Sequence, residues 1–155
     1  MNTPASIGRH PVHPMLVSLP IGLWTFSLVS DLVYRFGGGA EVWDSVAFYT
    51  LAGGVAGALL AAVPGFIDLL ALPAGKVKKV AVAHMAANLG AVVLFAVNLG
   101  LRLNAAPGAA VPVLLSAIGI ALLGVAGWLG GELVYVHGVG VQPAPDRAPG
   151  SSPHP

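Results

Sequence analysis

Four long apolar runs separated by short polar turns constrain this sequence more than any other feature. The runs cover about residues 15–34, 46–63, 80–101 and 111–136. Each has close to the roughly 20 residues that a helix needs to cross a bilayer. Only 8% of the residues are charged, whereas about 25% are charged in a soluble domain. The sequence therefore predicts an all-α integral membrane protein, with a four-helix bundle over residues 10–141.

The two ends of the chain differ from this apolar region. Residues 1–9 are polar and predict a flexible N-terminus without a cleavable signal peptide, and residues 142–155 are rich in Pro, Ser and Ala and predict a disordered tail. Four spans place both termini on one side. That side holds five of the seven Lys and Arg residues, including Lys76, Lys78 and Lys79. By the positive-inside rule, we expect the termini to be cytoplasmic.

Several functional classes are excluded by the composition. There is no cysteine, so thiolate metal sites and cysteine nucleophiles are absent from this chain. The net charge of +1 and the lack of a basic stripe argue against nucleic-acid binding. No nucleophile elbow, Walker loop, dinucleotide fingerprint or metalloprotease motif occurs. A hydrolase is therefore not expected.

Four histidines are the main candidates for chemistry. His10 and His13 precede the first run, His84 lies about one turn into the third, and His137 ends the fourth. The predicted topology brings all four to the cytoplasmic end of the bundle. Ionisable groups at such depths usually face the bundle interior or water. A histidine set without cysteines suits haem iron, or a zinc, copper or iron site completed by a carboxylate.

Each of these residues also has a purely structural interpretation. A histidine near a membrane surface often sits in the interface, and His84 or His137 could simply bond to a neighbouring carbonyl group. Asp68, near the end of the second run, could pair with a lysine, orient a histidine or bind metal directly. Asn88 lies on the helix face of His84 and could hydrogen-bond across the bundle.

Three further features have simpler explanations. Asp31 and Arg35, four residues apart, are expected to form a helix ion pair. Glu132 and His137 are five residues apart, roughly 140° around an α-helix, so we expect Glu132 to find a separate partner. The segment 127–131, Gly-Trp-Leu-Gly-Gly, indicates close helix packing or room for a flat macrocycle.

Four stretches of the sequence resemble a known family. These are HPVHPMLVSLPIG (10–22), VPGFID (63–68), HMAAN (84–88) and GWLGGELVYVHGVG (127–140). The chain resembles, from His10 to Val141, a prokaryotic membrane family catalogued as domain of unknown function 2231. That resemblance implies four transmembrane helices in a bacterial cytoplasmic membrane, and a link to Rieske iron–sulfur domains that follow this unit in some relatives. The chain is similar, more distantly, to four-helix b-type cytochromes.

Three hypotheses follow from these observations. The leading one is a redox protein that binds one haem b through two of His13, His84 and His137, or with His10, and exchanges electrons with a quinone or a Rieske-type or other protein. The second is a non-haem zinc, copper or iron site that uses His10, His13, His84, His137 and Asp68. The third is a structural subunit without a cofactor. A homo-oligomer is compatible with each.

Overall fold

The computed structural model describes residues 3–8 and 10–141, so the tail predicted to be disordered lies outside the described residues. Its elements, in chain order, are β1 (Ser6–Ile7), β2 (His10–Pro11), α1 (Val12–Leu16), α2 (Ser18–Phe36), α3 (Glu41–Ala71), α4 (Lys76–Arg102), α5 (Ala110–Gly131) and the π-helix η1 (Glu132–Val136). The sequence predicts a flexible N-terminus at residues 1–9. In the structure, Ser6 pairs with Pro11 in a short antiparallel β-hairpin.

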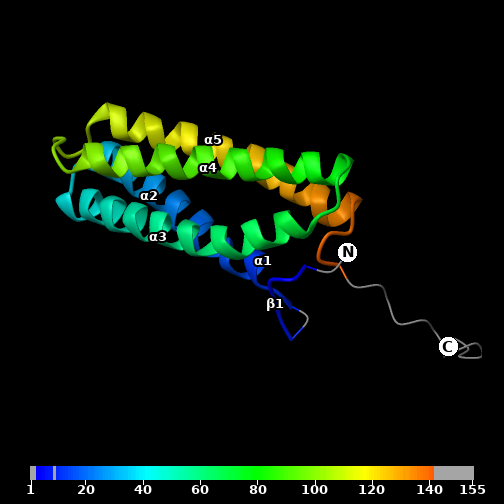
Figure 1. Ribbon diagram of the computed structural model, residues 1–155. Helices are drawn as coiled ribbons and strands as arrows, with labels where there is room; N and C mark the ends of the chain where they lie inside the picture. Colours follow the sequence, from blue (N-terminus) through cyan, green and yellow to red (C-terminus); the bar gives the residue numbers. More distant parts are fainter. Residues whose placement is uncertain (1–2, 9, 142–155) are drawn as a thin grey trace, which may run out of the picture.

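The predicted all-α membrane bundle is confirmed. Four helical segments, Val12–Phe36, Glu41–Ala71, Lys76–Arg102 and Ala110–Val136, are long and apolar enough to cross a membrane. Figure 1 shows them as an elongated bundle, in which α2 packs against α3 and α4 packs against α5. The first and last described segments meet at one end of the bundle. Their proximity is seen at Gly140, where an added Cβ would lie 3.3 Å from the Pro11 side chain.

Two prolines shape the helices differently. The first span breaks at Val17, between α1 and α2, three residues before Pro20, whose ring cannot bond to the carbonyl group one turn earlier. In contrast, α3 continues through Pro64 to Ala71, well past the end predicted near residue 63. Prolines are tolerated inside membrane helices where side chains of neighbouring helices bond to the exposed carbonyl groups. The carbonyl group that Pro64 leaves without its helical donor is that of Leu60, four residues earlier.

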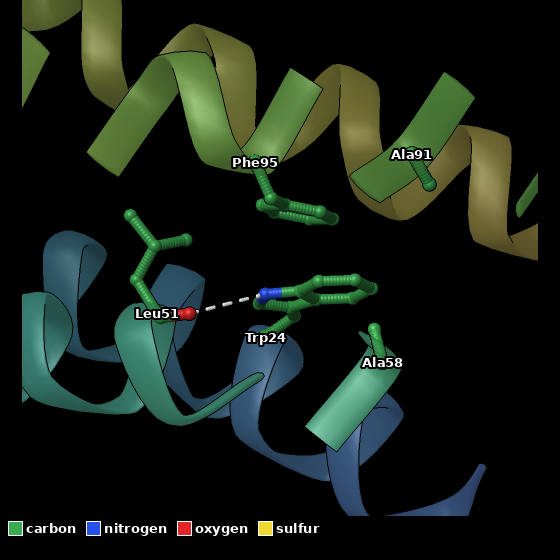
Figure 2. Packing of buried hydrophobic residues seen from close by; sticks show 5 residues of the cluster. All are labelled: Trp24, Leu51, Ala58, Ala91 and Phe95. Carbon is green, nitrogen blue, oxygen red and sulfur yellow. Dashed lines mark hydrogen bonds between the residues drawn. The ribbon is translucent and has the colours of Figure 1, made fainter. Parts of the chain in front are cut away.

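The centre of the bundle is an aromatic stack between diagonal helices. Trp24 of α2 and Phe95 of α4 lie with ring centroids 4.1 Å apart and planes at 15°, and Trp24 donates a hydrogen bond to the Leu51 carbonyl oxygen at 3.3 Å. Figure 2 shows this stack with Ala58 and Ala91 beside it. The stack belongs to a larger pattern along both helices.

The two halves of the chain repeat the same contacts. Three pairs face each other between the first span and α4, each separated by 71 positions: His13 with His84, Trp24 with Phe95, and Asp31 with Arg102. Their spacing of 11 and then 7 residues keeps them on one helix face. The helix pair formed by the first two spans is thus related to the helix pair formed by the last two by an approximate two-fold rotation about the bundle axis.

The α3 and α5 helices obey the same symmetry with an offset of 65 positions. Gly54 faces Trp24 as Gly119 faces Phe95, and Gly65 faces His13 as Gly130 faces His84. The carbonyl groups of Ala61 and Ala126 likewise accept from the two histidines. This internal repeat was not recognised in the sequence, because few of the paired residues are identical.

The central stack leaves no room for a methyl group on its glycines. A Cβ on Gly54 would lie 2.4 Å from Trp24, and one on Gly119 would lie 2.5 Å from Phe95. We expect Gly54→Ala and Gly119→Ala each to lower the free energy of unfolding by about 1–3 kcal/mol, as overpacking does. Thermal unfolding in detergent checks this. Gly124→Ala is the control, because its Cβ would meet nothing within 4 Å; an equal loss there would contradict the packing described.

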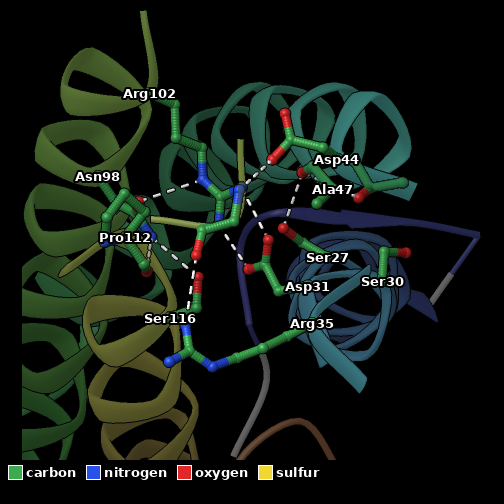
Figure 3. Close-up of polar contacts among 12 residues, drawn as sticks. Ser27, Ser30, Asp31, Arg35, Asp44, Ala47, Asn98, Arg102, Pro112 and Ser116 are labelled. Carbon is green, nitrogen blue, oxygen red and sulfur yellow. Dashed lines mark hydrogen bonds and ion pairs between the residues drawn. The ribbon is translucent and has the colours of Figure 1, made fainter. Parts of the chain in front are cut away.

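The end of the bundle away from the β1–β2 hairpin holds a buried ion pair. Arg102 donates two hydrogen bonds to Asp31, at 2.9 and 2.5 Å, and a third to Asn98 Oδ1 at 3.2 Å. Asn98 donates in turn to the Pro112 carbonyl oxygen and to Ser116 Oγ. Figure 3 shows this network between α2, α4 and α5. Its members are almost fully buried, with the Asp31 side chain only 1% exposed.

The predicted Asp31–Arg35 pair is wrong. Asp31 points toward the bundle axis, where α4 supplies Arg102, whereas Arg35 is exposed and donates to the carbonyl oxygen of Gly108 at 3.3 Å. The amide of Gly108 donates to Asp44 Oδ1 at 3.0 Å. Gly108 has a φ of +67°, and a Cβ there would lie 2.3 Å from the ring of Tyr34. Glycine therefore suits this turn, which Arg35 and Asp44 hold from both sides.

Candidate functional site

Two of the four candidate histidines face each other across the bundle axis. His13 lies in α1, at the start of the first span, and His84 lies in α4, about two turns from its first residue. Their ring centroids are 6.2 Å apart and the ring planes are at 90°. Both are partly buried. The predicted convergence of histidines from distant parts of the chain therefore holds for this pair.

Each ring is fixed by a hydrogen bond to a main-chain carbonyl group. His13 Nδ1 lies 2.8 Å from the Ala61 oxygen in α3, and His84 Nδ1 lies 2.8 Å from the Ala126 oxygen in α5. Because a carbonyl oxygen can only accept, each Nδ1 must carry the proton. In the neutral rings, the lone pairs are therefore on the Nε2 atoms, which point away from the anchoring helices. This is the arrangement of histidines that bind metals through Nε2.

Two glycines make room for the rings. A Cβ on Gly65 would lie 2.7 Å from His13 Nδ1, and a Cβ on Gly130 would lie 3.1 Å from His84 Cε1. A side chain at either position would push the imidazole away from its carbonyl partner. Gly130 lies in the segment 127–131, which predicts close packing or room for a macrocycle. Gly65 and the carbonyl groups of Ala61 and Ala126 are not among the predicted site residues, since a carbonyl group leaves no mark on the sequence.

An apolar cavity of about 510 Å³ adjoins the histidine pair. Its size falls in the range of roughly 300–1,000 Å³ that is typical of small-molecule and cofactor sites. All four spans contribute to its wall, and the hairpin and the segment after η1 line its outer end. The polar residues of its lining are Thr3, His13, Asp68, His84 and Asn88.

His10 and Asp68 do not join the pair. His10 is exposed in the hairpin, where its Nδ1 lies 2.9 Å from the Gly8 carbonyl oxygen. Asp68 accepts a hydrogen bond from the Ala5 amide at 2.9 Å; it thus holds the N-terminal segment against α3. Among residues 3–8 and 10–141, no group of three or more His, Cys, Asp or Glu side chains is placed to hold a metal ion.

His137 has a different environment from the one predicted. Its Nε2 lies 3.6 Å from Glu132 Oε1, so the prediction that these two side chains diverge is wrong. That prediction assumed an α-helix, whereas η1 is a π-helix in which the His137 amide donates to the Glu132 carbonyl oxygen five residues earlier, at 3.1 Å. The wider turn places residues i and i+5 on one face. His137 does not line the cavity.

Asn88 contacts His84 directly, as its predicted position on the same helix face implies. Its side-chain nitrogen lies 2.8 Å from the His84 carbonyl oxygen and 3.2 Å from His84 Nε2. The hydrogen bonds are within α4 rather than across the bundle.

The separation of the two rings is compatible with a metal ion between them. Imidazoles that bind one ion from opposite sides, each at about 2.0–2.1 Å, have ring centroids roughly 6 Å apart. The 6.2 Å separation of His13 and His84 matches this value. The apolar wall favours a ligand that brings its own apolar surface, rather than a hydrated ion.

Taken together, the fold and the histidine pair define a four-helix membrane protein with an apolar cavity at one end of the bundle. The family model described as predicted membrane protein (DUF2231) matches residues 9–143, so the chain belongs to this family of membrane proteins of unknown function. Neither the curated proteins nor the solved structures contain a significant match.

Proposed function

We propose that this protein binds one haem b between His13 and His84 and serves as an electron-transfer component of the membrane. The observation that carries the proposal is the facing pair of imidazoles, whose ring centroids are 6.2 Å apart and whose Nδ1 atoms each donate a hydrogen bond to a carbonyl oxygen. The two Nε2 atoms would hold the haem iron. Haem supplies reversible one-electron chemistry when two histidines hold it.

The surroundings of the pair support this choice of ligand. A large, mostly apolar cavity opens beside the imidazoles, which suits the apolar faces of a porphyrin. The anchored Nδ1–H groups fix the orientation of both rings and raise the basicity of the ligands. His10, His137 and Asp68 would not be ligands, because other contacts hold them away from the pair.

The partner and the orientation are part of the same proposal. The cavity end of the bundle would face the cytoplasm of a bacterium. Lys76, Lys78 and Lys79 lie at this end, in the first turn of α4, and positive residues favour the cytoplasmic side. A quinone in the bilayer, or a separate Rieske-type or other redox protein, would exchange electrons with the site.

An absorption spectrum of the purified protein tests the proposal. After expression with an adequate haem supply, the wild type in mild detergent should show a Soret band and a reduced-minus-oxidised difference spectrum. The double variant His13→Ala/His84→Ala should lose both, whereas His10→Ala/His137→Ala should keep them.

Two other outcomes would replace the proposal. Stoichiometric zinc, copper or iron without porphyrin, lost in the His13/His84 double variant, would indicate a non-haem site. A colourless, metal-free wild type under haem-replete conditions would instead favour a structural subunit.

A further inference from the structure

The internal symmetry of the bundle is broken beside the histidine pair. The offset of 71 residues that relates His13 to His84 also relates Val17 to Asn88. Both residues line the cavity, each one helical turn after its histidine. One imidazole therefore has an apolar neighbour, and the other has a carboxamide.

The Asn88 carboxamide donates to Nε2 of His84, whereas no such donor faces His13 among the described residues. Asn88 has two N–H bonds on its side-chain nitrogen, and its two acceptors are the His84 carbonyl oxygen at 2.8 Å and His84 Nε2 at 3.2 Å. With Nδ1 bonded to Ala126, both nitrogens of His84 have partners. His13 Nε2 makes no hydrogen bond to any residue in the described part of the chain.

We infer that the two histidines are not equivalent: His13 is the permanent ligand of the site, and His84 is an exchangeable ligand that Asn88 can hold away from it. This inference rests on the proposed haem site and deepens it. A position that His84 can vacate is open to a small diatomic molecule. Asn88 is thus a positioning residue, since it acts on the ligand through His84.

Carbon monoxide binding to the reduced protein tests this inference. Wild-type protein should bind carbon monoxide by displacing His84. Asn88→Leu introduces a side chain of similar shape that is also a good helix former, but leucine cannot donate a hydrogen bond to His84 Nε2. His84 should therefore compete better with carbon monoxide for the iron. The affinity for carbon monoxide should then fall about fivefold, the effect expected from one side-chain hydrogen bond. Asn104→Leu is the matched control, because Asn104 is exposed in the turn after α4, and it should leave the affinity unchanged.

Two single variants separate the roles of the two histidines. His84→Ala should retain pigment as a five-coordinate form with an increased affinity for carbon monoxide, whereas His13→Ala should lose most of the pigment. An Asn88→Leu affinity within twofold of the wild type, or retention of pigment by His13→Ala and not by His84→Ala, would overturn the inference while leaving the haem proposal intact. Absence of pigment in the wild type would overturn both.

Discussion

Replacement of Arg102 by methionine is expected to lower the free energy of unfolding by about 3–5 kcal/mol, because it leaves the Asp31 carboxylate buried without a counter-charge. The Asp31 side chain is only 1% exposed, and Arg102 donates a hydrogen bond to each of its two carboxylate oxygens. The same change removes the donor that Arg102 supplies to Asn98 Oδ1. Thermal unfolding of the purified protein in detergent measures the loss.

The double variant Asp31→Leu/Arg102→Met is the control for this prediction. It removes both charges and should recover most of the lost stability, because an apolar pair of similar volume is often as stable as a buried ion pair. The remaining loss would reflect the unpaired oxygen of Asn98. A double variant as unstable as Arg102→Met alone would show that the buried charge is not the cause.

The largest functional effect is expected from His13→Ala. Loss of groups that merely orient a metal ligand lowers affinity by about 10–100-fold, so loss of the permanent ligand should lower haem content at least as much. His10→Ala is the matched control, since His10 lies three residues earlier in the same motif but is exposed and bonded within the hairpin. Haem content per chain, measured as the pyridine haemochrome, should fall only in His13→Ala. An equal fall in both variants would assign the effect to the N-terminal segment as a whole.

The class of fold could be predicted from hydropathy alone. Four apolar runs of spanning length leave few alternatives in a bilayer, where backbone groups must bond within the helix. The helix ends were less accurate, as α3 shows: Pro64 is a helix breaker in water, but membrane helices tolerate proline, and α3 continues to Ala71. Whether a proline is tolerated depends on the neighbouring helices, so no local pattern reveals it.

The candidate site could be predicted only in part. Topology brings His13 and His84 to the same end of the bundle, and the structure adds that they face each other. Topology does not show that His10 turns into a hairpin or that a π-turn brings His137 to Glu132. The Asp31–Arg102 pair was also missed, because its members are 71 residues apart and a plausible local partner, Arg35, lies one turn away. The internal repeat would have predicted this pair, since it places His13 opposite His84 and Asp31 opposite Arg102 in a single register.

Electron paramagnetic resonance of the oxidised protein tests the central claim most directly, because it reports the iron, its axial ligands and their mutual orientation together. The ring planes of His13 and His84 are at 90°, and perpendicular axial imidazoles give a strongly anisotropic low-spin signal. We expect that signal in the wild type and in His10→Ala, and its loss in His84→Ala. A haem-replete preparation without a low-spin haem signal, or with one that survives in His84→Ala, would contradict the claim that this histidine pair holds the cofactor.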